Sequence, residues 1–482
     1  MQLLNNWKKR GALCSLALAL ILPSSIHAES SVSYTSNNVT YNGKSFSVKW
    51  VVVDLLDPYL RVRPVIAEEG FGHVEAFSTM MERNSAIAGI NGAFFSAYEQ
   101  DDSIRYPNGL MIKSGEIMHS GPNQAFEILA DKTAAVQHIE TELQIKASHN
   151  GKTYSFTPWG VNKYYGDNQT DQVIWYTPDF GRRIEFPNST KIVIRDGIID
   201  AITQQSVSIP EDGYIALIGN SNNNSRNLLP NLHVGDSITT VSSLKNLDSG
   251  DTSSLPKVDA AIGAGPRLLT EGAVDIDVTR DGFTDPKITK QSNVRSFIGI
   301  DTSKRLVMGN ISSSTLTEMA QVLLKLGLTD AMNLDGGAST GLFANGSVVT
   351  YPGRLLSNAF IVERMEHPQI QLEVNKQWVH EFRGYLYKET SMVPVRGILE
   401  RIGANFKWNG EERTLTVQHG NHRLLLRADS RTAELNQTKL QLPEAPSIID
   451  GHIYLPLRSV IEALGGQVEW DPQLYRAKLT IP

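Results

Sequence analysis

Short apolar runs that end on glycine recur along the first three quarters of the chain. Between about Val32 and Arg364, runs of β-branched and aliphatic residues alternate with glycine-containing breaks, which is the pattern of strands joined by turns. The clearest runs are WVVVDLL, IAGINGAFF, KIVIRDGIIDAI, GYIALIG, VDAAIGAGPRLL and RSFIGID. The pattern therefore predicts a strand-rich region with few helices.

One helix is clearly indicated within this region. Thr315 and Glu318 have the spacing of a capping box, apolar residues recur at helical intervals from Met319 to Leu326, and Gly327 supplies a stop. Two polar stretches, at positions 221–227 and 248–254, are expected to be surface loops.

The stretch NLDGGAST follows this helix and an apolar strand. A tight turn needs one glycine, whereas a second glycine lets the backbone approach a ligand closely. We expect Asp335 to be a catalytic carboxylate, with Gly336, Gly337, Ser339 and Thr340 binding substrate through amides and hydroxyls. On spacing alone, an aspartate that caps a tight turn is the alternative.

A repeat occupies the C-terminal part of the chain. The segment MVPVRGILERIGANFKWN (392–409) aligns with YLPLRSVIEALGGQVEWD (454–471) at a constant offset. In each copy a proline starts a short amphipathic helix, a glycine ends it, and the following strand carries a tryptophan. This order predicts a small domain in which the two copies pack against each other.

The expected fold class is α+β, with a mixed, β-sheet-rich catalytic domain of few helices followed by a small α+β repeat domain. Pro368 and several polar residues interrupt the strand pattern between the two. We therefore expect a signal peptide at 1–28, a catalytic domain at 29–366, a linker at 367–377 and a two-repeat domain at 378–482.

The N-terminus has the layout of a secretory signal peptide. Lys8, Lys9 and Arg10 precede an apolar run at 12–22, and a cleavage site follows Ala28. An N-terminal membrane anchor is the alternative, but the run is short for a span. We expect the mature protein to be secreted or associated with the cell wall of a bacterium, without stable insertion in the membrane.

Net charge argues against nucleic acid as a partner, and cysteine content argues against disulfide bonds in the mature chain. The net charge is -6, and removal of the three leader cations leaves 42 basic and 51 acidic residues, or -9, so nucleic acid is not an expected partner. The only cysteine, Cys14, lies in the leader. The mature chain therefore has no disulfide and depends on its core for stability.

Eight stretches in one order resemble the phosphodiester glycosidase family over about Ser45 to Arg364. They are INGAFF, GVNKYY with VIWYTPDFG, KIVIRDG, GDSI, GAGPRLL, RSFIGID, NLDGGAST and LLSNAFIV. That family includes the enzyme that uncovers mannose 6-phosphate by removing N-acetylglucosamine. It usually reads DGGGS, and in this chain Ala338 takes the place of the third glycine. The C-terminal repeat resembles the copper amine oxidase N-terminal-like domain.

The resemblance implies hydrolysis of a sugar-1-phosphodiester, with an N-acetylglucosamine-like sugar, to free sugar and a phosphomonoester. Such a site needs a cation for phosphate, and Arg295 can supply a bidentate fork. With Asp335 and Arg295, Asn91 completes the expected catalytic set, and Arg267 and Asn358 are expected to bind substrate. The alternatives are a structural arginine at 295, a hairpin turn at Asn91 and a backbone partner at Asn358.

No cofactor is expected to be required, although an acid-lined pocket could hold a structural Ca²⁺ ion. The C-terminal histidines His419, His422 and His452 lack ligand spacing, so copper is not implied. No H-E-x-x-H helix or P-loop is present in the sequence. The expected partners are the sugar phosphodiester and, for the C-terminal domain, cell-wall glycan. The alternative function is a non-catalytic exported protein that binds cell-wall or capsule glycans.

Overall fold

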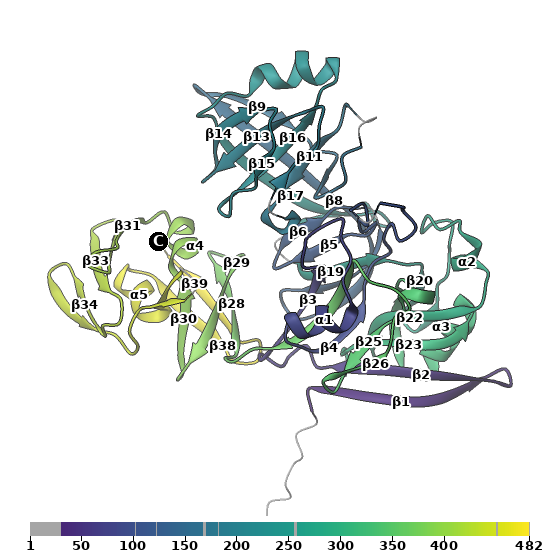
Figure 1. Ribbon diagram of the computed structural model, residues 1–482. Coiled ribbons are helices and arrows are strands. Elements are labelled where there is room, and N and C mark those ends of the chain that lie inside the picture. The colour runs from purple at the N-terminus through teal and green to yellow at the C-terminus, as the bar shows by residue number, and fades with distance from the viewer. Residues whose placement is uncertain are drawn as a thin grey trace, which may run out of the picture.

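Strands dominate the fold and helices are few, as the sequence pattern predicts (Figure 1). The expected signal peptide, residues 1–28, lies outside the described residues. None of the helices in the described ranges is long and apolar enough to cross a lipid bilayer. The computed structural model describes residues 30–101, 103–121, 123–166, 170–181, 183–254, 258–449 and 452–481.

One antiparallel sheet carries the strand that precedes NLDGGAST. Its strands are, in spatial order, β1 (Val32–Tyr41), β2 (Lys44–Val53), β23 (Leu306–Ser314), β22 (Asn293–Asp301), β24 (Leu328–Asn333), β20 (Arg267–Thr270) and β21 (Ala273–Val274). Phe297 on β22 pairs with Asn333 on β24, so the start of β22 lies beside the end of β24. This register places RSFIGID next to the loop that follows β24.

Helix α3 (Leu316–Lys325) covers one face of this sheet. The predicted capping box is confirmed, because the Glu318 amide donates to Thr315 Oγ1 at 3.2 Å and the Thr315 amide donates to Glu318 Oε2 at 2.8 Å. Met319 and Leu323 on its buried face pack into a core shared with the sheet. Gly327 follows the helix with φ +85°, where a side chain would be strained.

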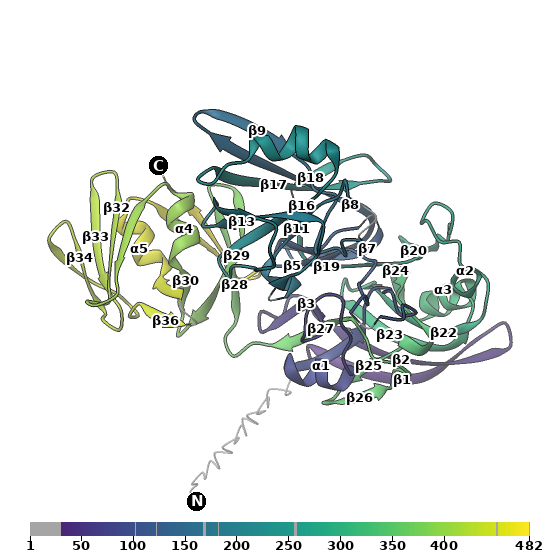
Figure 2. The same cartoon turned by 45° about the horizontal axis from the view of Figure 1, so that its top comes forward.

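A second, larger sheet packs on the other face and rises away from the first (Figures 1 and 2). Its strands are, in order, β10 (Gly160–Val161), β11 (Val173–Tyr176), β16 (Gly213–Gly219), β13 (Ser189–Arg195), β14 (Ile198–Thr203), β17 (Ser237–Asn246), β8 (Ala134–His149), β7 (Asn123–Leu129), β19 (Val258–Ala264), β5 (Met111–Lys113) and β6 (Glu116–His119), with β9 (Lys152–Phe156) beside β8 and β18 (Thr252–Ser254) beside β17.

A smaller antiparallel sheet completes the region that holds the candidate site. Helix α1 (Phe77–Arg83) packs on it. Its strands are, in order, β26 (Ser347–Thr350), β25 (Leu342–Ala344), β4 (Ala86–Asn91), β27 (Asn358–Arg364) and β3 (Leu60–Ile66), and a separate pair is β12 (Arg183–Ile184) with β15 (Val207–Ser208).

The two stretches expected to be polar surface loops contain regular structure. A π-helical turn spans Asn224–Leu228, and Asn224 is buried with its side-chain amide donating to backbone carbonyl groups. The second stretch ends in β18, and its Asp248 pairs with Arg267. Both stretches are largely exposed, so the expectation of polar surface segments is confirmed, and only the short helical turn and strand depart from a loop.

The C-terminal repeats form two sheets and two short helices. Helices α4 (Val395–Arg401) and α5 (Leu457–Ala463) each follow a proline that serves as the N-cap. The strands form one sheet in the order β36 (Ser447–Ile449), β37 (His452–Pro456), β30 (Thr390–Pro394), β29 (Gln377–Tyr387), β28 (Gln369–Val374), β39 (Arg476–Thr480) and β38 (Gln467–Asp471), and another in the order β31 (Asn405–Asn409), β32 (Thr414–His419), β33 (His422–Arg427), β34 (Thr432–Leu435) and β35 (Thr438–Gln441).

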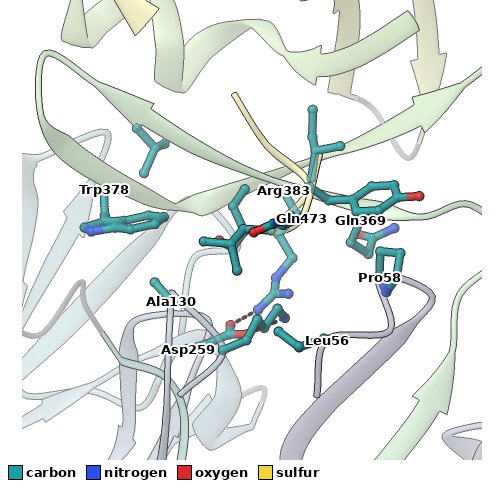
Figure 3. Close-up of a pocket in the computed structure, with 14 residues that line it drawn as sticks. Leu56, Pro58, Ala130, Asp259, Gln369, Trp378, Arg383 and Gln473 are labelled. Atoms are coloured by element: carbon teal, nitrogen blue, oxygen red, sulfur yellow. Dashed lines mark ion pairs between the residues drawn. The ribbon is translucent and has the colours of Figure 1, made fainter. Parts of the chain in front are cut away.

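The two repeats share one apolar core, and this core is separate from those of the larger region. Its buried residues run from Ile370 to Ile481, whereas the buried residues of the other clusters all precede Glu363. An ion pair joins the two parts: Arg383 on β29 pairs with the buried Asp259 on β19 (Figure 3). Lys132 lies 3.6 Å from the same carboxylate.

Candidate functional site

The loop after β24 turns sharply over the end of the first sheet. A 3-10 turn, Gly337–Ser339, follows Asp335 and Gly336. A Cβ atom at Gly336 would lie 3.0 Å from the Val294 carbonyl oxygen, and Gly337 has φ +58°. The structure therefore explains why both positions are glycine: the backbone approaches another strand closely at Gly336, and Gly337 has a left-handed conformation.

This loop forms one wall of a pocket of ≈ 240 Å³. The other walls come from three segments that are distant in the chain: the residues after β4, helix α2 (Pro286–Thr289) with the start of β22, and the loop before β27. The lining residues that carry polar or charged groups are Tyr98, Asp285, Lys287, Asn293, Arg295, Asn333, Asp335, Ser339 and Arg354.

Asp335 is a half-buried carboxylate in this pocket. Burial raises its pKa to about 6, although hydrogen bonds from Ser339 and the Gly336 amide and the positive charge of Arg354 act in the opposite direction. The amide of Gly336 donates to Asp335 Oδ1 at 2.9 Å. A carboxyl group with this pKa exchanges its proton close to neutral pH, which suits acid, base or nucleophilic chemistry.

The first amides of the turn can bind an anion. The N–H groups at the start of a helical turn have no partner within that turn, and here they belong to Gly337 and Ala338. Both residues line the pocket and are exposed. The alanine in place of the third glycine keeps its amide, so this departure from the family pattern leaves the donor in place.

Two cations flank the exposed ring of Tyr98 at the pocket rim. The guanidinium carbon of Arg354 lies 5.0 Å from the ring centroid, and Lys287 Nζ lies 5.5 Å from it. Asp285 caps α2 by accepting from the Lys287 amide at 2.8 Å, which fixes the start of the segment that carries Lys287. The rim therefore offers positive charge where the pocket opens to solvent.

Arg295 lines the same pocket, but its fork is engaged with the protein. Nε donates to the Ser314 carbonyl at 2.7 Å, and Nη2 donates to the Ile288 and Gln291 carbonyls at 2.9 and 2.8 Å. Burial lowers its pKa to about 10. These contacts fit the alternative of a structural arginine, because they tie the end of α2 to the sheet. The Nε and Nη2 atoms donate to backbone carbonyl groups, so they do not form the expected bidentate contact with phosphate.

Asn91 lies beneath the loop, and it is not among the residues that line the pocket. Its Nδ2 donates to the Asp335 carbonyl at 2.7 Å, and its Oδ1 accepts from Ser296 Oγ at 2.6 Å and the Gly341 amide at 3.0 Å. The side chain thus clamps both ends of the Asp335 loop to the sheet. Direct contact with substrate was expected, but this buried side chain bonds to the protein through both its nitrogen and its oxygen and so positions the loop.

Asn358 and Thr340 are also buried away from the pocket. Asn358 Oδ1 accepts from the Ala93 amide at 2.7 Å, and its Nδ2 donates to the Ala93 carbonyl at 3.2 Å. A Cβ at Gly92 would lie 2.2 Å from that Oδ1. Gly92 therefore makes room for this clamp, and Asn91–Gly92 is not a hairpin turn.

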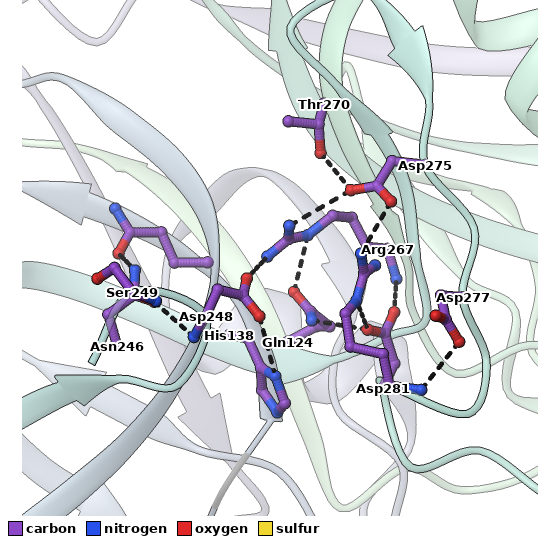
Figure 4. Close-up of polar contacts among 12 residues, drawn as sticks. Gln124, His138, Asn246, Asp248, Ser249, Arg267, Thr270, Asp275, Asp277 and Asp281 are labelled. Carbon is purple, nitrogen blue, oxygen red and sulfur yellow. Dashed lines mark hydrogen bonds and ion pairs between the residues drawn. The ribbon is translucent and has the colours of Figure 1, made fainter. Parts of the chain in front are cut away.

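Arg267 is engaged elsewhere and does not line the pocket. Figure 4 shows its guanidinium surrounded by acids and an amide: Nη2 pairs with Asp248 at 2.7 Å, Nη1 with Asp275 at 3.4 Å, and Nε donates to Gln124 Oε1 at 3.0 Å. The second phosphate cation expected at this position is absent, because the side chain points into this network.

The structure thus brings Asp335, Gly336, Gly337, Ser339 and Arg295 to one pocket and leaves the other predicted residues outside it. Sequence reasoning missed Tyr98, Lys287 and Arg354. Tyr98 follows INGAFF and Arg354 precedes LLSNAFIV, so their position beside two of the resembling stretches was an available signal. Lys287 had no such signal. A structural Ca²⁺ ion in an acid-lined pocket stays a prediction.

Residues 188–363 match the family model described as phosphodiester glycosidase. The resemblance to the phosphodiester glycosidases is confirmed. The matched segment contains Asp335, Arg295, Lys287 and Arg354, whereas the wall formed by Tyr98 lies before it. Residues 373–479 match the model of the copper amine oxidase N-terminal domain.

Among curated proteins, the human N-acetylglucosamine-1-phosphodiester alpha-N-acetylglucosaminidase is 34% identical over 86 residues, which is 17% of this chain and 17% of the human enzyme. A solved hypothetical protein from Synechocystis is 22% identical with a TM-score of 0.57, covering 69% of this chain and 62% of that one. A putative exported protein from Burkholderia pseudomallei is 16% identical with a TM-score of 0.54, covering 66% and 74%. The two structures show that the chain shares its fold with other proteins over about two thirds of its length, and the chain spans only part of the human enzyme.

Proposed function

We propose that the protein hydrolyses the bond between the anomeric carbon of an N-acetylglucosamine-like sugar and a phosphate, releasing free sugar and a phosphomonoester. The observation that carries the proposal is the pocket in which Asp335, with a pKa of about 6, lies with two rim cations and two available amides. The match to the phosphodiester glycosidase model supports it.

The charges in the pocket suit an anionic substrate. Lys287 and Arg354 can attract the phosphate, and the Gly337 and Ala338 amides can donate to its oxygens. Phosphate is a better leaving group than an ordinary alcohol, so its oxygen depends less on protonation by a general acid. One carboxyl group near the anomeric carbon can therefore replace the pair that common glycosidases use. Asn91 and Arg295 hold the two walls in place through their backbone contacts.

The test is the release of free sugar from N-acetylglucosamine-1-phosphodiester analogues by the chain without its leader. Hydrolysis by the protein, and loss of most turnover in Asp335→Asn, are the expected results. Asp212→Asn is the matched control, because Asp212 is about half exposed, lies in the turn before β16 and does not line the pocket. Absence of free sugar across a panel of sugar phosphodiesters would overturn the proposal.

A glycan-binding role for the C-terminal region is a second candidate, favoured by an aromatic groove of ≈ 690 Å³ at its junction with the larger region. His367 and Tyr385 stack with centroids 5.4 Å apart, and Tyr385 lies 5.3 Å from Tyr454. Aromatic rings with one polar end suit wet, partly apolar ligands such as sugars. We propose cell-wall glycan as the ligand; cosedimentation with cell-wall material should fall in Tyr385→Ala and not in Tyr351→Ala, an exposed tyrosine elsewhere.

We also propose that residues 1–28 direct export and that the mature protein is secreted or held at the cell wall. The basic start, apolar run and cleavage site after Ala28 support this. N-terminal sequencing of protein from the culture medium and the wall fraction should begin at Glu29. Recovery of the uncleaved chain from the cytoplasm would contradict the proposal.

A further inference from the structure

Two histidines and one aspartate meet at the outer end of the second sheet, far from the pocket in sequence and in no contact with it. His149 ends β8, and the turn Asn150–Gly151 leads into β9. Asp236 directly precedes β17. Because Ser148 on β8 pairs with Ser237 on β17, the next pair in this antiparallel register is His149 and Asp236.

The nitrogen atoms of both histidines converge on the same carboxylate. His149 Nδ1 contacts Asp236 Oδ1, and His233 Nδ1 lies 3.5 Å from Asp236 Oδ2. The two imidazole rings lie face to face at a tilt, with centroids 4.6 Å apart. One ligand atom from each of the three residues lies within 4.8 Å of the others.

The burial of the three side chains is uneven in a way that suits a bound ion. The Asp236 side chain is fully buried, whereas those of His149 and His233 are 46% and 51% exposed. The His233 amide donates to Asp236 Oδ2 at 2.8 Å. This hydrogen bond holds the carboxylate in a fixed orientation.

We propose that His149, His233 and Asp236 form a binding site for a divalent transition-metal ion of the Zn²⁺ class. Two imidazole nitrogens and one carboxylate oxygen are donors that Zn²⁺ accepts, whereas Ca²⁺ and Mg²⁺ require oxygen ligands. Three protein ligands leave a position open, and the exposed side of the two rings gives it access to water. The ion would replace the hydrogen bond between His149 and the carboxylate and join the β8–β9 turn to the loop before β17.

Asn150 supplies the outer partner that such a site needs. Its amide lies 2.9 Å from His149 Nε2. When Nδ1 binds a metal, the ring proton resides on Nε2, and the carbonyl end of the Asn150 amide can accept it from the same position. The proposal is independent of the glycosidase activity, because none of these residues lines the pocket.

Zinc binding can be measured by isothermal titration and by metal analysis on the leaderless chain after treatment with a chelator. We expect about one Zn²⁺ ion per chain, little or no binding of Ca²⁺ or Mg²⁺, and at least a tenfold loss of Zn²⁺ affinity in both His149→Gln and His233→Gln. The control is His452→Gln, which removes an exposed histidine of the C-terminal region and should bind Zn²⁺ like the unaltered protein.

Both altered rings are about half exposed, so the variants should retain the fold, and circular dichroism checks this. Absence of Zn²⁺ binding at micromolar concentrations in the unaltered chain would overturn the proposal. The same conclusion follows if both variants bind Zn²⁺ unchanged, or if His452→Gln weakens binding as much as they do. Sugar release is measured in parallel and should be the same in all three variants.

Discussion

Asp335→Asn should stabilise the protein at neutral and alkaline pH while removing its activity. Burial places the folded-state pKa of Asp335 at about 6, above its usual 3.8. Below about pH 4 the carboxyl group is protonated in both the folded and the unfolded chain, so its burial does not lower the free energy of unfolding. Between about pH 4 and 6 the folded state holds the proton that the unfolded state has lost. Stability therefore falls as the pH rises through this window, and the full penalty applies above it.

The magnitude follows from the size of the shift. A difference of roughly two pKa units corresponds to about 3 kcal/mol of free energy of unfolding. Asp335 is only partly buried, and screening by solvent reduces this to about 1–2 kcal/mol. Asparagine has the same shape and carries no charge, so it escapes this penalty while its oxygen can still accept from the Gly336 amide. For a region of this size, the gain corresponds to roughly 1–3 °C in Tm.

The assay is thermal unfolding of the unaltered protein and of Asp335→Asn at pH 4 and at pH 8. The difference in Tm between the two proteins should be larger at pH 8 by roughly 1–3 °C. Asp212→Asn, at an exposed carboxylate, should show no such growth with pH. In the same samples, Asp335→Asn should lose roughly 10²-fold or more in kcat.

A Tm difference that is the same at both pH values would refute the burial of this carboxylate as the source of its pKa. Near-normal sugar release by Asp335→Asn would refute its catalytic assignment independently. Loss of activity together with a pH-independent Tm difference would leave Asp335 in the reaction but remove the electrostatic explanation.

Arg354→Ala should raise KM for the phosphodiester roughly tenfold with a smaller change in kcat, whereas Arg195→Ala, at an exposed position on the second sheet, should leave both constants unchanged; equal effects would contradict a rim cation. Arg267→Met should lower the free energy of unfolding by about 3–5 kcal/mol, because it leaves the surrounding acids unpaired, and denaturant unfolding measures this. A chain that ends at Met365 should fold and release sugar, since the two parts share no apolar core; an insoluble product would show that the Asp259 contact is required for folding.

Features that depend on neighbours close in the chain were predictable. The helix after Thr315 was indicated by a capping box that spans four residues and by a glycine stop, and it forms as expected. The two glycines after Asp335 were expected to allow a close backbone approach, and the structure has one at Gly336. The Pro, helix, Gly and Trp order of the C-terminal repeats also reappears, because each copy repeats the same local interactions.

The roles of individual polar side chains were not predictable to the same degree. Arg267 and Arg295 have the chemistry to bind phosphate, but the residue type alone does not reveal which groups the fold places beside each side chain. In the structure one meets two carboxylates and the other three carbonyl groups. The role of Asn91 was likewise not predictable, since its side-chain amide bonds to a loop about 250 positions later in the chain.

The sequence by itself therefore determined the strand-rich class, the helix at 316–325, the C-terminal repeat and the acidic loop at 335. Only the tertiary structure decided that Arg354 and Lys287 stand beside Tyr98, and that His149 and His233 meet at Asp236. Caps, glycine turns and apolar periodicity act over a few residues, so they can be read along the chain. The partner of a polar side chain depends on the pairing register of strands that are separated by up to hundreds of residues, and that register is decided when the sheets pack.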